Sequence, residues 1–279
     1  MSKTTITIGN FDGVHVGHQK VLRCLKERGE RGIVFTFSNH PSHVLAKVPK
    51  PLLSTPEHKL FLLEKEGVEL IVEPFTHEFS QKSAETFLTE LKEKTGFTHL
   101  ILGHDAVIGK DREGRCALLE ILGKKLRFEL EYLSPVSFEQ EIVSSSLLRK
   151  VIKEGDFAHA LPLLGRPYSI CARVIQEAGK GKAIGFPTAN LDVSMLCLPP
   201  FGVYAVSVDG KRGVANLGLA PTLHEKRLPR LEVHLLESNE ELYNKTLDVM
   251  FLKFIRPEKK FSSVEELRTQ IVRDIELAR

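Results

Sequence analysis

The order of predicted strands and helices changes once along the chain, near Gly165, and this change restricts the fold more than any other feature. Before Gly165, short apolar runs alternate with helical segments, which is typical of a parallel sheet with crossover helices. The nearly continuous apolar run at 32–37 favours a strand that is buried on both faces. The elements expected in this half are a strand ending at Gly9, strands at 32–37, 68–75 and 98–103, and helices at 17–28, 83–96, 144–155 and 156–164.

After Gly165 the predicted strands follow one another without helices between them, which indicates an antiparallel β-barrel. The last segment, 262–279, predicts an amphipathic helix. Ser262 or Ser263 can cap this helix, with a glutamate three residues further on. Its apolar stripe consists of Val264, Leu267, Ile271 and Ile275.

Length and composition favour an ordinary globular chain of two domains, which we expect at 1–156 and 157–279. Of the 279 residues 42% are hydrophobic and 27% charged, and a net charge of +3 is too small to argue for a nucleic-acid partner. No apolar stretch approaches the ~20 residues needed to cross a bilayer, and the start MSKTTITIG lacks the pattern of a signal peptide. The four scattered cysteines favour reduced thiols in a cytoplasmic protein.

The segment GNFDGVHVGH, from Gly9 to His18, joins the first predicted strand to the first predicted helix. His15 and His18 are three residues apart, so both imidazoles are expected on one face of the helix start, where free N–H groups and the helix dipole favour phosphate. Gly17 allows a phosphate to approach the backbone, and Gly9 and Gly13 allow a tight turn. Two donors aimed at a phosphate oxygen would stabilise the charge that grows as pyrophosphate leaves.

Other polar segments fall at the ends of predicted strands, at 39–41 and 103–105. Ligands of parallel α/β sheets bind beyond the carboxyl ends of the strands, so these segments are expected to converge with GNFDG on one crevice.

Two other interpretations of the histidine pair remain open. A bare HxxH pattern is more often a pair of surface residues beside a structural turn. Zinc ligation would require further ligands, which the surrounding sequence does not offer. The strand before the pair, the helix after it and GNFDG between them favour the phosphate site.

GNFDGVHVGH resembles the signature of the nucleotidyltransferases with the HxGH motif. In this wording it is similar to the adenylyltransferase module of the prokaryotic bifunctional riboflavin kinase/FMN adenylyltransferase (FAD synthetase) family. FSNHP is similar to the PHP segment of that family, with Asn39 in place of proline. GHDAVIG, at 103–109, is similar to its G-x-D/N-F-x-F-G segment, with Ala106 and Ile108 in place of the aromatics.

VSSSLLR, at 143–149, is similar to the SSTxIR motif of the superfamily, which binds the phosphates of ATP. A serine-rich helix start followed by an arginine is also a possible phosphate grip by itself, although SSSLLR alone would be read as a capped helix. The resemblance implies His15 and His18 as catalytic residues. The nucleotide-binding residues expected in this half are Gly9, Asn10, Phe11, Asp12, Gly17, Gly103, Asp105, Ser145, Ser146 and Arg149.

A second phosphate site is predicted in the segment GKGKAIGFPTANL. GKGK alone would be a flexible turn, but Pro187 fixes the backbone after it. Thr188 and Asn190 alternate onto one side of an extended strand, and their hydroxyl and amide oxygens suit Mg²⁺ bound with ATP. Glycines that bring the backbone close to the ligand are Gly179, Gly181 and Gly185, and Lys180 and Lys182 add positive charge.

The segment RLEVHLLE supplies a candidate general base. Glu232 alternates with the apolar Val233 and Leu235, and a carboxylate in a partly apolar barrel mouth can have its pKa raised and accept a proton. PTAN resembles the hallmark of the riboflavin kinase module, and the resemblance implies Glu232 as the catalytic glutamate. A solvated strand glutamate is the alternative, and His234 is expected to be structural.

The resemblance extends from Gly9 to Arg279 and implies a Rossmann-like α/β nucleotidyltransferase domain, followed by an antiparallel β-barrel riboflavin kinase domain with a terminal helix. It implies an enzyme that phosphorylates riboflavin to FMN and adenylylates FMN to FAD with MgATP, so that ATP, riboflavin and FMN are the partners. One rival is another HxGH nucleotidyltransferase, which would need no PTAN barrel. The other is a riboflavin kinase or flavin-binding regulatory protein whose adenylyltransferase site is weakened at Ala106 and Ile108.

Overall fold

The computed structural model describes residues 3–175, 185–221, 227–236 and 242–279. Contacts group the chain into two compact units. The first consists of Met1–Leu52 and Pro56–Leu147, and the second of Leu53–Thr55 and Leu148–Arg279. The division falls within one helix, α7 (Ser145–Glu154), and the domain boundary expected after residue 156 stays a prediction.

The first unit is built on a five-stranded parallel sheet in the order β3-β2-β1-β4-β5. From β1 the chain proceeds through β2 to β3, and it then returns to β4 on the other side of β1. This reversal creates a switch point between β1 and β4, where ligands of such sheets bind beyond the carboxyl ends of the strands. The strands are β1 (Thr4–Ile8), β2 (Arg31–Phe37), β3 (Glu69–Glu73), β4 (His99–Gly103) and β5 (Glu129–Leu133).

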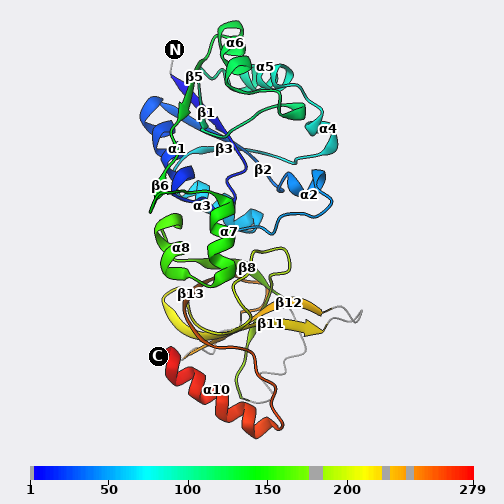
Figure 1. The fold of residues 1–279 in the computed structure, drawn as a ribbon, viewed down its shortest axis with the longest axis vertical. Helices are drawn as coiled ribbons and strands as arrows, with labels where there is room; N and C mark the ends of the chain where they lie inside the picture. Colours follow the sequence, from blue (N-terminus) through cyan, green and yellow to red (C-terminus); the bar gives the residue numbers. More distant parts are fainter. Residues whose placement is uncertain (1–2, 176–184, 222–226, 237–241) are drawn as a thin grey trace. The chain divides into compact units, whose positions relative to one another are not determined.

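Helices cover both faces of this sheet (Figure 1). On one face α1 (Val16–Arg28) and α3 (Pro56–Glu64) bury leucines against β2. On the other face α5 (Ala84–Thr95) and α6 (Cys116–Leu126) enclose the larger core, which is rich in phenylalanine. Shorter elements of this unit are α2 (Ser42–Leu45), α4 (His77–Ser80), the 3₁₀ turn Lys110–Arg112, β6 (Ser137–Phe138) and β7 (Glu141–Ile142), whereas α8 (Phe157–Leu164) belongs to the second unit.

The second unit contains a closed antiparallel barrel in the order β10-β11-β12-β9-β8-β13. Alternate side chains of each strand face the interior, which is apolar: Leu231 and Val233 of β12 are buried there. The strands are β8 (Ser169–Ile175), β9 (Ala189–Asp192), β10 (Gly202–Val208), β11 (Lys211–Pro221), β12 (Arg227–Leu235) and β13 (Thr246–Arg256). The expected fold class, a parallel α/β unit and an antiparallel barrel with a terminal helix, is confirmed.

The terminal helix α10 (Val264–Ala278) packs on the outer face of the barrel, against β10, β11 and β13 (Figure 1). Ser263 is its N-cap and accepts a hydrogen bond from the backbone N–H of Glu266, as the sequence predicts. The Glu266 carboxylate accepts from the backbone N–H of Ser262, and this bond together with Lys259 lowers its pKa to about 2. Among the described residues, no helix is both long and apolar enough to cross a bilayer.

Candidate functional sites

The turn from β1 to α1 is tight and strained. Phe11, Gly13 and Val14 have φ angles of 54°, 81° and 39°, and the N–H of Val14 donates to the carbonyl of Phe11 at 3.1 Å. A β-branched residue such as Val14 rarely adopts positive φ. Strain of this kind, of order 1–3 kcal/mol per residue, concentrates at ligand sites because the surrounding structure must hold it in place. His15 directly follows this turn.

His15 is the N-cap of α1, directly before the first residue of the helix. Its Nδ1 accepts from the N–H of His18 at 3.4 Å, and the two rings stack with centroids 3.7 Å apart. A Cβ on Gly17 would lie 3.0 Å from Cε1 of His15. Gly17 therefore leaves room for the His15 ring. The two stacked imidazoles lie at the N-terminus of α1, the positive end of the helix dipole.

The start of α7 adjoins this turn. The hydroxyl of Ser144 accepts from the N–H of Leu147 at 3.2 Å, which caps the helix. The hydroxyl of Ser145 donates to the carbonyl of Asp12 at 3.1 Å, so the structure joins the serine motif to GNFDG, 133 residues earlier. Ser146 is exposed, and Arg149 lies on the part of α7 that belongs to the second unit.

The end of β4 carries the GHDAVIG segment beside β1. The N–H of Ala106 donates to the carbonyl of Gly103, and the Asp105 side chain is exposed in this turn. Ile108 is 6% exposed and belongs to the core formed with α5 and α6, and Ala106 packs against that core. At Ile108 the departure from the aromatic pattern is thus a matter of core packing. Asn39 bonds both backbone groups of Phe75 and joins the ends of two neighbouring strands.

Lys59, on α3, is a charged group that the sequence reasoning missed. Its side chain is only 5% exposed, and its ammonium donates to the carbonyl of Phe37, the last residue of β2, at 2.5 Å. Burial lowers its pKa to about 8, while the charge of Asp12 acts to raise it. A buried cation therefore lies at the carboxyl ends of β1 and β2, although EHKLF shows no signal for it.

In the barrel, two residues of the predicted kinase site, Asn190 and Glu232, form one row with Asn216, which the sequence did not single out. Glu232 of β12 pairs directly with Asn190 of β9 on one side and with Asn216 of β11 on the other. Direct cross-strand partners lie on the same face, with Cβ atoms about 4.5–5.5 Å apart. Asn216 is also the partner of Val203, which packs against α10, so the row lies on the outer face of the barrel.

The oxygen atoms of this row fit a hard cation. Asn190 is 8% exposed, and its Oδ1 has no hydrogen-bond partner among the described residues. A buried amide oxygen without a partner is costly unless a ligand satisfies it, and amide and hydroxyl oxygens suit Mg²⁺. Thr188, half-buried, directly precedes β9 and completes the predicted pair.

The glycines of the second site are only partly described. Gly185 has a φ of 88°, a conformation that favours glycine. Gly179 and Gly181, with Lys180 and Lys182, lie outside the described residues.

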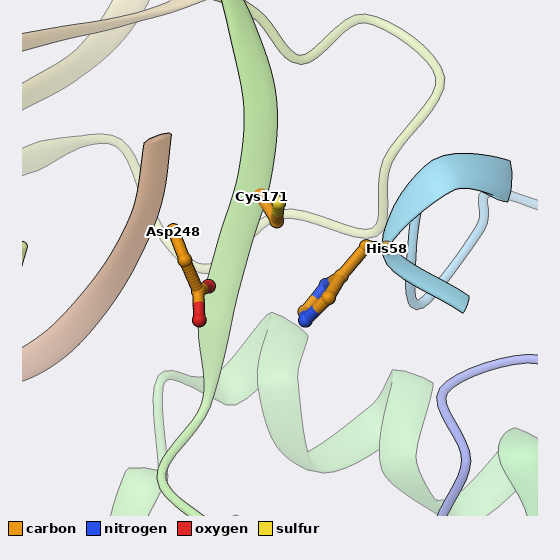
Figure 2. A group of neighbouring side chains, drawn as sticks. All are labelled: His58, Cys171 and Asp248. Atoms are coloured by element: carbon orange, nitrogen blue, oxygen red, sulfur yellow. The ribbon is translucent and has the colours of Figure 1, made fainter. Parts of the chain in front are cut away.

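Figure 2 shows His58, Cys171 and Asp248, which come from α3, β8 and β13. His58 belongs to the first unit and the other two residues to the second. Within the barrel, Cys171 and Asp248 are direct partners in the β8–β13 ladder. Asp248 also attracts the buried guanidinium of Arg166, whose pKa burial lowers to about 10. A thiol and a carboxylate are fewer ligands than a zinc site needs, so no metal centre is assigned to them.

A nucleotidyltransferase-like parallel sheet joined to a closed antiparallel barrel, each with a candidate phosphate site, defines a class of two-domain enzymes. Two family models match the chain, FAD synthetase over residues 1–147 and riboflavin kinase over residues 164–279. The chain belongs to the bifunctional riboflavin kinase/FMN adenylyltransferase family, as the sequence motifs predict.

Two individual relatives carry the same description, and one solved structure has a similar fold. A bifunctional riboflavin kinase/FMN adenylyltransferase of Bacillus subtilis is 37% identical over 98% of this chain and 90% of its own length. The Escherichia coli K12 protein of the same description is 36% identical over 96% of this chain and 90% of its own length. A crystal structure described as a macrolide-efflux protein from Streptococcus pneumoniae has a TM-score of 0.82 at 28% identity, and covers 100% of this chain and 94% of that one.

Proposed function

We propose that this chain phosphorylates riboflavin to FMN in its barrel unit and adenylylates FMN to FAD in its α/β unit, with ATP as the donor in both steps. The observation that carries the proposal is the row Asn190–Glu232–Asn216, in which Glu232 is the direct cross-strand partner of a buried asparagine whose Oδ1 has no hydrogen-bond partner within the described part of the chain. The membership of the chain in a bifunctional family supports the same conclusion.

In the kinase step, Glu232 accepts the proton of the ribityl 5′-hydroxyl while that oxygen attacks the γ-phosphorus of ATP and ADP leaves. Thr188 and Asn190 would hold Mg²⁺ with the nucleotide, and the ion supplies positive charge that neutralises the phosphate oxygens. Because Asn190 and Glu232 are fixed by one β-ladder, the proton acceptor and the metal-binding oxygen keep a constant spacing.

In the adenylyl transfer step, a phosphate oxygen of FMN attacks the α-phosphorus of ATP and pyrophosphate leaves. The protein needs no nucleophile of its own for this step, and its task is to position the reactants and to stabilise charge. The stacked imidazoles of His15 and His18 and the first N–H groups of α1 provide donors for the phosphate oxygens. Ser145 ties the start of α7 to the same turn.

The proposed partners are small molecules, namely ATP, riboflavin and FMN. We place both reactions in the cytoplasm, because the four cysteines are free thiols in the structure.

Two single substitutions test the assignment of one activity to each unit. His18→Ala is expected to lower FAD formation from FMN by roughly 10²–10³, because it removes a donor to the developing charge. Glu232→Gln keeps the shape of the side chain but removes the proton acceptor, which is expected to lower riboflavin phosphorylation by roughly 10²–10⁴. Chromatography of products from riboflavin or FMN with MgATP measures both.

Each variant is the control for the other. His18→Ala should phosphorylate riboflavin at nearly the wild-type rate, and Glu232→Gln should form FAD from FMN at nearly the wild-type rate. Loss of both activities in a folded variant would contradict separate sites. Unimpaired phosphorylation by Glu232→Gln would show that Glu232 is an ordinary strand residue.

A further inference from the structure

The segment Phe186–Thr188, which precedes β9, lies outside the β-ladders that hold Asn190 and Glu232, as far as the described residues extend. The pairing of β9 with β12 runs from Asp192 opposite Arg230 to Ala189 opposite Val233, and stops there. Thr188 is the next residue, and the proline before it has no N–H to donate. Backbone pairing thus fixes Asn190 but leaves the Thr188 hydroxyl to be placed by other contacts.

A side chain of β12 makes such a contact. Nδ1 of His234 lies 2.8 Å from the carbonyl oxygen of Pro187. A carbonyl accepts, so Nδ1 carries the proton and the imidazole is the donor. The ring of Phe186 meets the His234 ring edge to face, with centroids 5.6 Å apart and planes at 85°. His234 therefore holds the two residues directly before Thr188, one by a hydrogen bond and one by an aromatic contact.

The same strand also carries the proton acceptor. His234 is two residues after Glu232, so both side chains lie on the outer face of β12. β12 thus fixes three groups at once: Glu232 directly, Asn190 through the ladder and the approach to Thr188 through His234. Metal-binding groups must be held within about 0.5 Å of the productive geometry, and supporting residues that orient the ligands provide this precision.

We propose that His234 is a positioning residue of the kinase site: its hydrogen bond to Pro187 places the Thr188 hydroxyl beside Asn190 for binding of the divalent cation with the nucleotide. This inference rests on the proposed kinase activity of the barrel. It revises the expectation that His234 is only structural, and it assigns His234 no contact with substrate.

The test compares two substitutions at this one position. In His234→Asn the amide nitrogen stands where Nδ1 stood, since both atoms are bonded to Cγ, so the donor to Pro187 is kept. His234→Leu has similar bulk and no donor. The readouts are the KM for MgATP, kcat, the KM for riboflavin, and the affinity for ADP by calorimetry with and without Mg²⁺.

For His234→Leu we expect the KM for MgATP to rise about tenfold or more and the affinity for Mg·ADP to fall by a similar factor, as for the loss of one hydrogen bond in a site. The KM for riboflavin and the affinity for metal-free ADP should change little. His234→Asn should recover most of the Mg·ADP affinity. FAD formation from FMN in the other unit should be unchanged in both variants.

His43→Leu is a matched control, because Nε2 of His43 also contacts a backbone carbonyl, that of Lys50, but in the first unit. It should leave riboflavin phosphorylation at the wild-type rate. Absence of phosphorylation in the wild-type protein would refute the proposed kinase and not the role of His234 alone.

With an active wild type, two results would overturn the inference. One is a His234→Leu variant with unchanged Mg·ADP affinity. The other is equal loss in the leucine and asparagine variants, which would show that the imidazole itself is required. If His234→Leu does not fold, the comparison of His234→Asn with wild type still tests the inference. The inference requires that His234→Asn binds Mg·ADP with near-normal affinity.

Discussion

Gly17 leaves room for the His15 ring in the proposed adenylyltransferase site. Its Cβ would lie 3.0 Å from Cε1 and 3.1 Å from Nδ1 of His15, distances that real Cβ atoms rarely show. Gly17→Ala should therefore displace the His15 ring from its stack on His18. We expect FAD formation to fall by roughly 10-fold to 10²-fold, because misplacement by about 1 Å can cost that much.

The fold should tolerate this substitution, since alanine is the better helix former. Thermal unfolding within a few degrees of wild type and an unchanged riboflavin kinase rate are the controls. A Gly17→Ala enzyme that makes FAD at the normal rate would show that the ring has room to move.

Lys59 makes the stability of the protein depend on pH in an unusual direction. Its pKa is about 8 in the folded protein, below the ordinary value of 10.5 for lysine. Below pH 8 both states carry the proton, and burial of the charge destabilises the fold. Between pH 8 and 10.5 the unfolded chain binds more protons than the folded one, so this contribution to the free energy of unfolding rises with pH. It amounts to at most about 3 kcal/mol.

Lys59→Met removes the titrating group and keeps an unbranched side chain. We expect the difference in free energy of unfolding between Lys59→Met and wild type to favour the variant most at pH 7 and to shrink towards pH 10. Urea unfolding at several pH values measures it. A difference that is constant with pH would contradict the lowered pKa of Lys59.

Helix α10 is held on the barrel by an ion pair between the buried Asp274 and the half-buried Arg256. Asp274, only 2% exposed, accepts from Nε and Nη2 of Arg256 at 2.9 and 2.7 Å, and from Nε2 of Gln270 at 2.9 Å. Removal of one partner of a fully buried pair typically costs about 3–5 kcal/mol, because it leaves an uncompensated buried charge. Asp274→Ala leaves the half-buried Arg256 without its carboxylate, so it should loosen α10, with faster hydrogen exchange along this helix and a loss of stability no larger than about 3–5 kcal/mol.

Glu276→Ala, at an exposed position of the same helix, is the matched control and should change stability by less than about 0.5 kcal/mol. The double variant Arg256→Met/Asp274→Leu should be more stable than Asp274→Ala, because neither charge is left alone. If the backbone amides of α10 exchanged as slowly in Asp274→Ala as in wild type, the apolar contacts of α10 alone would be sufficient to hold the helix on the barrel.

Elements with strong local signals could be predicted from the sequence. The interior strand β2 is apolar because both of its faces are covered, and the cap of α10 follows from Ser263 and Glu266 alone. The edge strand β5 was missed. Its glutamates Glu129 and Glu131 interrupt the apolar run, since an edge strand can pair such side chains with neighbouring cations, as Arg28 shows.

The functional sites show the same difference between local sequence patterns, which could be predicted, and long-range contacts, which could not. The strand–turn–helix context of His15 and the segment PTAN are local patterns, and they led to the correct family. Lys59 and His234 act through carbonyl groups 22 and 47 residues away in sequence. Contacts of this kind depend on how segments meet in three dimensions, so neither the spacing nor the type of these residues could reveal them.

The row of Asn190, Glu232 and Asn216 also restricts how the gene of such an enzyme can change in length. Side chains of a strand alternate between two faces, so a single inserted residue before Glu232 within β12 would turn the carboxylate into the apolar barrel interior. The same insertion would detach it from both asparagines. Insertions and deletions among relatives are therefore expected in the connections between strands, while β9, β11 and β12 keep constant length around this row.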